Sequence, residues 1–535
     1  MKKPSSRFIK TVAVLLAVFA VFSCAVWAFE SLTDDIFKFN TPTYIKPNSK
    51  TDGIIKNKND YEAYIFEVPE NGVLSVSLDH DNFADTLKDG WIITLYKISK
   101  VDGKEQYDEI TYFKSFWSDV TASWGETGVA PGEYLILVEP GEFILDVNFT
   151  LVLRYVKTNA YESEFNDTKE TAMPVESSCE IFGSSSQRKD SNDIDWFKLT
   201  LKHDGFVNIT FSHEDKSLPV VAWLVTLTSE DGTVLSDFSS KLSEPTVTSG
   251  DVSLKAGVYY VCVESQVVYG NTYSLKFDMG SVSGGEYEPN DSPEEATLID
   301  ENEYITGALA PRLLGLDKDY YKINVPKDGT VDISFKHSAS QEDYAGWNVR
   351  LLKKESDGSY SEIVRKISHW NEEEFKITGI GLGAGEYYIA IDADSMKYNS
   401  AQYNLKWTFT PHSTYEKELN NTRDTANPVT FNTNWYGKLI TKDVDFDNDY
   451  FSFETAEPKN VCVQLRHGVG SDSSVAWTVS VISESGEVIA SVMSSKSDDV
   501  VSTGVVELEN AGKYYVLVET GLVESEEEYN FIIIT

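Results

Sequence analysis

The residues that could do chemistry in this chain are carboxylates that recur in a fixed pattern. Three segments read Glu-x-Glu-x-Asn and close with Asp or Asn, and we call them the acidic segments. They are Glu162, Glu164, Asn166 and Asp167; Glu286, Glu288, Asn290 and Asp291; and Glu416, Glu418, Asn420 and Asn421. In an extended chain residues i, i+2 and i+4 point the same way, so the two Glu and the Asn form one oxygen-bearing face. Pro289 favours that extension at Glu288.

A pair of aspartates follows each acidic segment 26 to 28 residues after its closing residue. These Asp pairs are Asp193 and Asp195, Asp317 and Asp319, and Asp447 and Asp449. We expect no basic partner near these acids, so their meeting would leave four or five carboxylates unpaired. Calcium takes six to eight oxygen ligands in flexible geometry and suits such a set better than magnesium does. The sequence therefore predicts calcium sites in which all of these residues except Asn421 are ligands.

Some alternatives stay open for these acids. Asn-Asp followed by Thr or Ser is also typical of a surface turn whose carboxylates are solvated. Asp190 is an alternative to one member of its neighbouring Asp pair, and Asp443 and Asp445 extend the last cluster, in which Asn421 removes a charge. A site is less expected in the first repeat, whose corresponding segment has only Glu30, Asp34 and Asp35, with Asp60 and Glu62 later.

These acids belong to a repeat that has the length of a domain. Glu162, Asp195, His213 and Trp223 are separated by 33, 18 and 10 residues, and two later copies keep the same gaps. The later copies are Glu286, Asp319, His337 and Trp347, then Glu416, Asp449, His467 and Trp477, and an upstream copy fits at Glu62, His80 and Trp91. A period of about 125 to 133 residues suits a whole domain and is too long for a solenoid repeat. We predict four domains, at residues 29–157, 158–282, 283–411 and 412–535.

Alternating apolar residues predict that each repeat is built from β-strands. In the second repeat Val207, Ile209 and Phe211 alternate with polar residues, and a later strand begins at Trp223. Repeats two to four also carry Ala-Gly-x-Tyr-Tyr, in which Gly supplies a turn and the first Tyr falls on the apolar face. Short strands with turn signals every ten or so residues predict an all-β chain of tandem antiparallel β-sandwiches.

The recurring histidine is the tempting catalytic candidate. Each copy falls in phase with the apolar residues before it, so we expect it to pack beside the Trp at one end of the core, with a ligand-facing role as the alternative. The sequence has no Gly-x-Ser-x-Gly elbow, no His-Glu-x-x-His pair and no phosphate-binding glycine loop. We predict no enzyme and no catalytic residue. Four aromatic residues outside the repeat signature either finish a core or stack on sugars: Trp117, Trp124, Trp370 and Trp435.

The N-terminus and the charge predict an extracellular protein. Residues 1–28 combine four basic residues with an apolar stretch and a small-residue cleavage site, as in a secretory signal peptide; an uncleaved or lipidated anchor is the alternative. Its removal lowers the formal charge from −39 to −43, which disfavours nucleic acids and anionic membranes as partners. Three cysteines at non-equivalent positions, Cys179, Cys262 and Cys462, argue against a disulfide framework.

The acidic segment, the Asp-x-Asp-Trp/Tyr-Phe/Tyr strand and the Ala-Gly-x-Tyr-Tyr strand together resemble the bacterial pre-peptidase C-terminal domain family. The resemblance covers repeats two to four and part of the first. It implies jelly-roll-like sandwiches on secreted bacterial proteins, and calcium held between the acidic segment and the Asp pair. The chain departs from the family habit because no peptidase is attached.

We therefore expect a secreted or cell-surface, non-catalytic protein that is stabilised by calcium and binds an extracellular polymer or protein. Repetition favours this function, because tethered weak sites raise avidity. The alternatives are a calcium-stiffened structural spacer or envelope component, and an accessory protein to a separate secreted hydrolase.

Overall fold

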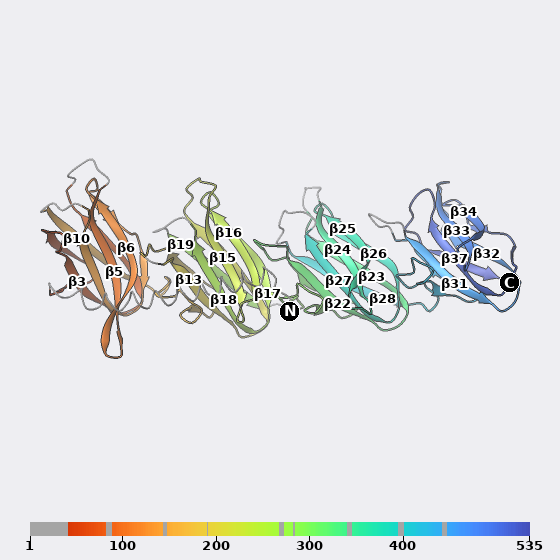
Figure 1. Cartoon of the computed structure of the whole chain (residues 1–535), viewed down its shortest axis with the longest axis horizontal. Coiled ribbons are helices and arrows are strands. Elements are labelled where there is room, and N and C mark those ends of the chain that lie inside the picture. The colour runs from red at the N-terminus through yellow and green to blue at the C-terminus, as the bar shows by residue number, and fades with distance from the viewer. Residues whose placement is uncertain are drawn as a thin grey trace, which may run out of the picture. The chain divides into compact units, whose positions relative to one another are not determined.

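The computed structural model describes residues 41–81, 88–142, 147–189, 191–266, 272–281, 284–339, 345–393, 401–440 and 447–535. Every regular element in these residues is a β-strand, and within them no helix has the length and apolar character needed to span a membrane. The described strands form eight sheets that pair into β-sandwiches, which confirms the predicted fold class (Figure 1). The predicted signal segment and six acids lie outside the described residues: Glu30, Asp34, Asp35, Asp190, Asp443 and Asp445.

The first two sandwiches share one strand order. In the first, one sheet has the order β1 (Thr43–Tyr44), β3 (Glu62–Val68), β9 (Gly132–Pro140), β5 (Asp89–Val101) and β6 (Lys104–Phe116). The other has β2 (Ser49–Ile55), β10 (Val147–Lys157), β4 (Gly72–Asp79) and β7 (Thr121–Ser123), with β8 (Thr127–Val129) also paired to β4. The second sandwich has β11 (Met173–Val175), β13 (Ile194–Leu201), β18 (Gly257–Ser265), β15 (Val221–Ser229) and β16 (Val234–Lys241). Its other sheet has β12 (Cys179–Ser184), β19 (Thr272–Ser281), β14 (Gly205–His213) and β17 (Thr246–Leu254).

The third and fourth sandwiches repeat this order. The third has β20 (Thr297–Leu298), β22 (Lys318–Val325), β27 (Gly385–Ala393), β24 (Ala345–Lys354) and β25 (Tyr360–His369) in one sheet. Its second sheet has β21 (Ile305–Gly307), β28 (Tyr403–Pro411), β23 (Gly329–His337) and β26 (Glu374–Leu382). The fourth has β29 (Asn427–Pro428), β31 (Asn448–Thr455), β37 (Gly512–Thr520), β33 (Val475–Ser483) and β34 (Val488–Ser495). Opposite lie β30 (Asn434–Gly437), β38 (Tyr529–Ile534), β32 (Lys459–His467) and β35 (Val500–Ser502), with β36 (Val506–Leu508) on β32.

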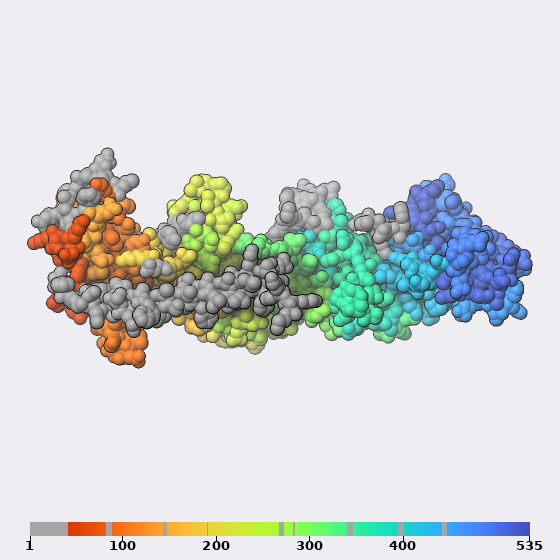
Figure 2. Space-filling view, viewed as in Figure 1, coloured from red at the N-terminus to blue at the C-terminus, as the bar shows by residue number. Residues whose placement is uncertain are grey.

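Contacts divide the chain into two compact units. The first unit holds the first sandwich and most of the second, and the other holds the third and fourth together with Lys202–Val207 and Ser249–Gly257. In the first unit the turn between β5 and β6 projects beyond the first sandwich (Figures 1 and 2). The limits predicted for the four domains stay a prediction.

Short parallel strands are a detail that the sequence did not reveal. The first strand of one sheet in each sandwich pairs parallel to its neighbour: β1 with β3, β11 with β13, β20 with β22, and β29 with β31. The other strand pairings whose residue register is described are antiparallel, for example β24 with β27. Each short parallel strand follows an irregular segment, and in the last three sandwiches that segment is the acidic one.

The core of each sandwich contains a histidine, a tryptophan and a serine. The histidine and tryptophan rings lie 4.4, 4.5, 4.2 and 3.9 Å apart in order along the chain, which confirms the predicted packing. The histidine Nε2 lies 2.7 to 2.9 Å from a serine Oγ. The four serines are Ser115, Ser240, Ser368 and Ser494, and each lies opposite the tryptophan on the edge strand, where a register shift precedes the tryptophan.

These histidine–serine pairs are structural. The four serines are 0 to 1% exposed, so no substrate reaches their hydroxyls. The histidine Nδ1 faces the backbone oxygen of the next residue in every copy, where a catalytic triad would place a carboxylate. The histidine therefore ties the end of one strand to the opposite sheet.

Candidate metal centres

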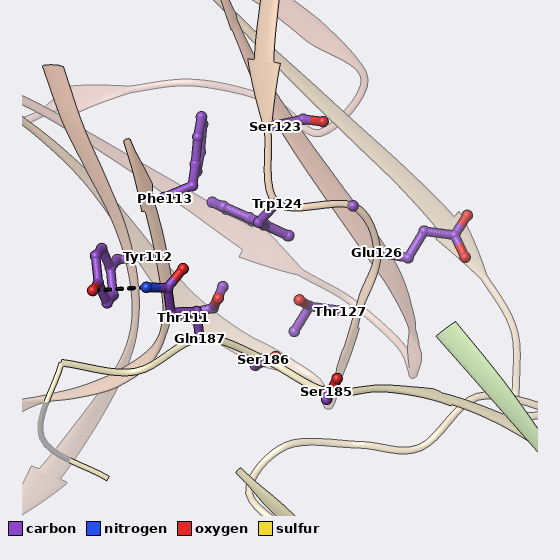
Figure 3. Close-up of a pocket in the computed structure, with 11 residues that line it drawn as sticks. Thr111, Tyr112, Phe113, Ser123, Trp124, Glu126, Thr127, Ser185, Ser186 and Gln187 are labelled. Carbon is purple, nitrogen blue, oxygen red and sulfur yellow. Dashed lines mark hydrogen bonds between the residues drawn. The ribbon is translucent and has the colours of Figure 1, made fainter. Parts of the chain in front are cut away.

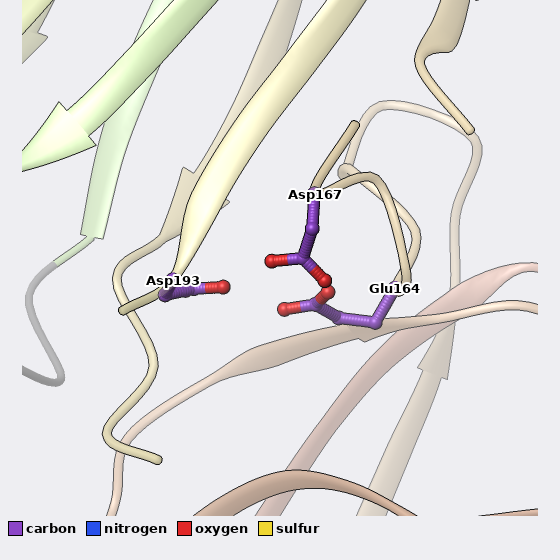
Figure 4. Close-up of side chains that lie close together, drawn as sticks. All are labelled: Glu164, Asp167 and Asp193. Carbon is purple, nitrogen blue, oxygen red and sulfur yellow. The ribbon is translucent and has the colours of Figure 1, made fainter. Parts of the chain in front are cut away.

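The structure brings each acidic segment together with its Asp pair. In the second sandwich the carboxylates of Glu164, Asp167 and Asp193 point toward one another, with oxygens within 4.8 Å (Figure 4). Glu288, Asp291 and Asp317 form the corresponding group in the third sandwich. In the fourth, the group of this kind is Glu416, Glu418 and Asp449. The predicted meeting of two separate stretches is therefore observed, while the role of these residues as metal ligands stays a prediction.

The first glutamate of each acidic segment lies at what we call the inner end of its cluster, next to a tyrosine of the last strand. A backbone N–H donates to its Oε1 at 2.6 Å, from Ser184 to Glu162, Ala308 to Glu286 and Lys438 to Glu416. A tyrosine hydroxyl from the last strand lies between this glutamate and the second aspartate of the pair. In the second sandwich Tyr273 lies 3.0 Å from Glu162 Oε2 and 2.6 Å from Asp195 Oδ2. Tyr403 and Tyr529 make the same pair of contacts in the later sandwiches.

A glycine makes room for this tyrosine. A Cβ added at Gly183 or Gly437 would lie 2.4 Å from the hydroxyl of this tyrosine, and one added at Gly307 would lie 2.6 Å from it. Any side chain at this position would therefore push the tyrosine away from the acids. In the first sandwich the residue paired opposite the equivalent glycine, Gly53, is Phe149, which has no hydroxyl. This difference agrees with the weaker expectation of a site in the first repeat.

An arginine lies at the outer end of the cluster in the second sandwich. Arg188 Nη2 lies 2.9 Å from Glu164 Oε2 and 2.7 Å from Asp193 Oδ1, and its Nη1 lies 2.5 Å from Asp167 Oδ1. The Arg188 side chain is only 6% exposed, so these are buried ion pairs. The expectation that no basic partner is near the acids was therefore wrong.

The third sandwich repeats this arrangement with Arg312. Its Nη2 lies 3.1 Å from both Asp291 Oδ2 and Asp317 Oδ1, and 4.0 Å from Glu288 Oε2. Both arginines lie five residues before the first aspartate of the pair, outside the two motifs that define the cluster. Lys442 has this position in the fourth repeat and lies outside the described residues. The sequence signal for these basic residues is their constant spacing from the Asp pair.

Burial raises the pKa of the clustered carboxyl groups. It raises the pKa of Glu162 to about 8, that of Glu286 to about 7 and that of Asp193 to about 6. The Arg188 guanidinium opposes this shift at Asp193, but desolvation outweighs it. Desolvation also raises the pKa well above the ordinary value for Glu164, Asp195, Glu288, Asp317, Asp319, Glu416 and Asp449.

The donor set fits a hard divalent cation at its inner half. Carboxylate and amide oxygens without a hydrogen-bond partner are buried there in all three clusters: Asn166 Oδ1, Asp195 Oδ1, Asn290 Oδ1, Asp319 Oδ1, Asn420 Oδ1 and Asp449 Oδ1. Carboxylate and amide oxygens are ligands that a hard cation accepts. At the outer half, however, the arginine uses the oxygens that a cation would take in the second and third sandwiches. A cation and the guanidinium therefore compete for the same carboxylates.

Comparison with known proteins agrees with the resemblance seen in the motifs. No family model matches the chain. Collagenase ColT of Clostridium tetani (strain Massachusetts / E88) is 27% identical over 241 residues, which are 44% of this chain. The match spans 22% of that collagenase, so most of the relative has no counterpart here.

Among solved structures, the chain is similar to the pre-peptidase C-terminal domain of a collagenase from Bacillus anthracis. That likeness has 16% identity and a TM-score of 0.17, over 22% of this chain and 96% of that one. The CUB1-EGF-CUB2 domains of rat MASP-1 match 44% of the chain with 12% identity and a TM-score of 0.16. The predicted resemblance to pre-peptidase C-terminal domains is confirmed, and the number of copies is not tested by these matches.

Without a divalent cation, we expect the free energy of unfolding to fall as the pH rises from about 4.5 toward 8. The ordinary glutamate pKa is 4.5, and burial raises that of Glu162 to about 8. The folded chain therefore holds extra protons between these values, and their loss favours unfolding. Thermal unfolding in chelator across this range measures the effect. The triple variant Glu162→Gln, Glu286→Gln and Glu416→Gln should have a flatter profile, and identical profiles for the two proteins would contradict the prediction.

Removing the arginine should make the second sandwich more dependent on a cation. Arg188→Gln leaves buried carboxylates without their ion pair, which destabilises by roughly 3 to 5 kcal/mol in chelator. Added calcium should stabilise this variant more than the wild type, because nothing competes for Glu164 and Asp193. Chemical unfolding with calcium or chelator measures both effects. Arg154→Gln, on the exposed face of β10 in the same unit, is the control, and an equal calcium response in all three proteins would contradict the competition.

Proposed function

We propose that this chain is an extracellular, non-catalytic protein whose repeated sandwiches bind an extracellular polymer or protein. The observation that carries the proposal is the repetition of one sandwich, with one strand order, along a single chain. In each described copy the serine of the histidine–serine pair is buried, and the histidine is buried in three copies and half-buried at His213. Repeated modules of this kind gain avidity when they are tethered in one chain.

Two further observations support this proposal. The C. tetani relative is named a collagenase, and the match to this chain spans only 22% of its length. The B. anthracis domain to which the chain is similar is the pre-peptidase C-terminal domain of a collagenase. These names make collagen one ligand to test, together with polysaccharides.

The acidic clusters have a stabilising role in this proposal. A divalent cation, with calcium favoured by the all-oxygen donor set, would be held by Glu162, Glu164, Asn166, Asp193 and Asp195 and by their counterparts in the next two sandwiches. Such an ion supplies positive charge that offsets the buried carboxylates. At a hundredfold excess over its dissociation constant it adds about 2.7 kcal/mol per site.

A structural spacer is the second candidate, and contacts of the acidic segments favour it. Glu164 N donates to Gly128 O of the first sandwich at 3.3 Å, and Lys97 Nζ lies 3.5 Å from Glu164 O. In the second unit Glu418 N donates to Gly381 O at 2.9 Å, and Lys353 Nζ lies 3.4 Å from Glu418 O. A cation bound to the segment would therefore stiffen the junction with the preceding sandwich.

Retention on an extracellular matrix tests the leading function. We expect the mature chain to be retained on at least one member of a panel of collagen, cellulose, xylan, chitin and peptidoglycan. It should not hydrolyse generic ester, peptide or glycoside substrates. An inert protein of similar acidity is the control for ionic retention. No retention beyond this control on the whole panel would exclude the function, and hydrolysis would exclude the non-catalytic part.

Small-angle scattering tests the spacer. If calcium stiffens the junctions, chelator should change the maximum dimension or the flexibility of the full chain, and calcium should restore it. The triple variant Glu162→Gln, Glu286→Gln and Glu416→Gln should respond less than the wild type. Profiles that are identical with calcium and with chelator would contradict this second function.

A further inference from the structure

A cavity of about 330 Å³ lies within the first compact unit, where the first sandwich meets residues 185–187 (Figure 3). Its walls come from β6, from the segment between β7 and β8, and from the loop that follows β12. The loop runs along the edge of β6: Tyr112 N donates to Gln187 O at 2.9 Å, and Arg188 Nε donates to Ile110 O at 3.0 Å. Backbone pairing and an ion-paired arginine therefore fix one wall of the cavity.

The cavity combines aromatic surface with buried polar atoms that have no partner. Trp124 lies beside Phe113, with ring centroids 5.3 Å apart, and Figure 3 shows it between Phe113 and Thr127. Trp124, Thr127 and Ser186 are 7, 1 and 4% exposed, respectively. Trp124 Nε1, Thr127 Oγ1 and Ser186 Oγ all lack a hydrogen-bond partner. Buried donors and hydroxyls in native proteins are normally paired, and these three belong to residues that line the cavity.

The chain contains an internal comparison for this cavity. Ser186 N donates to Asp193 Oδ2, and Ile440 N makes the same contact with Asp447 in the fourth sandwich. At that second junction the cavity shrinks to about 10 Å³. Ile440 lines it together with Lys438, whose Nζ donates to Thr378 O at 2.6 Å. A larger apolar residue closes the space there, so the open, polar cavity is a property of the first junction.

The lining residues restrict the chemistry of the ligand. They include no lysine or arginine, and the chain is strongly acidic, so an anion is excluded. The one acid, Glu126, is exposed, and its carboxylate points away from Trp124 in Figure 3, so it does not select a cation in the cavity. Hydroxyls and an indole N–H beside aromatic faces suit a neutral ring that carries hydroxyl groups. The volume lies at the lower end of small-molecule pockets.

We infer that this cavity binds one neutral sugar ring of an extracellular polysaccharide. Trp124 packs against the ring and donates from Nε1, while Thr127 and Ser186 exchange hydrogen bonds with its hydroxyls. This inference rests on the proposed binding function and gives it a ligand class and a place.

Calorimetric titration of the full mature chain tests the cavity. The probes are cello-, xylo-, manno-, galacto- and chito-oligosaccharides. We expect one of them to bind at one site per chain. The double variant Thr127→Val and Ser186→Ala removes two neutral hydrogen bonds and should weaken binding about tenfold to a hundredfold. Ser186→Ile fills the space as Ile440 does at the other junction and should abolish binding without unfolding the chain.

A matched control exists in the same unit. Thr228 Oγ1 and Ser236 Oγ are also buried without a partner, and neither residue lines the cavity. The double variant Thr228→Val and Ser236→Ala makes the same chemical change and should bind like the wild type. Equal loss in both double variants, or no loss in the cavity variants, would overturn the inference.

The two proposals can fail separately. If no sugar binds the wild type but the chain is retained on collagen, the cavity inference is wrong and the binding function stands. If sugars bind with unchanged affinity in the cavity variants, the ligand class is right and the place is wrong, which also overturns the inference. If the wild type binds nothing on the panel and no sugar in titration, both proposals are wrong.

Discussion

The burial of several carboxylates at the start of a sandwich is the constraint on which the rest of the structure depends. An isolated buried carboxylate is strongly unfavourable, so each must be protonated, paired or hydrogen-bonded. The structure uses all of these. Backbone N–H groups and a tyrosine hydroxyl hold the inner acids, and an arginine pairs with the outer ones in the second and third sandwiches. The hydrogen bonds and ion pairs leave a set of inner oxygens without partners. A divalent cation would coordinate these oxygens.

This constraint also explains why the acids lie at junctions. The acidic segment leaves one sandwich and begins the next, and its backbone hydrogen-bonds to the preceding sandwich in each unit. Close approach requires a residue without a side chain, since a Cβ at Gly128 would lie 1.8 Å from Glu162 O and one at Gly381 would lie 2.3 Å from Glu416 O. Any change in the charge of the cluster therefore acts on a segment that touches two sandwiches. A cation bound to the acidic segment would therefore also act on the junction.

The two junctions described within the units differ in a way that bears on function. In each cluster a loop begins at the residue whose backbone N–H donates to the first glutamate. This loop carries Ser184 and Ser186 at one junction, and Lys438 and Ile440 at the other. At the first junction Ser186 lines a cavity, whereas the second junction closes the space with an alkyl side chain and a lysine bonded to the neighbouring sandwich. Copies that share one core have therefore diverged at their contacts, as is expected when modules keep a fold and change a task.

The sequence by itself determined the repeat, the strands and the two acidic motifs, because alternation and constant spacing are local properties of the chain. It also placed the histidine beside the tryptophan, since both fall in phase with apolar neighbours. Only the tertiary structure decided which other groups join them. Tyr273, Arg188 and Ser240 are far in sequence from Glu162 or His213, and strand pairing and loop path alone bring them into contact. Trp124 likewise packs in the core of its own sandwich and lines a cavity. The other side of that cavity comes from residues 185–187 of the next sandwich, and no local pattern encodes this contact.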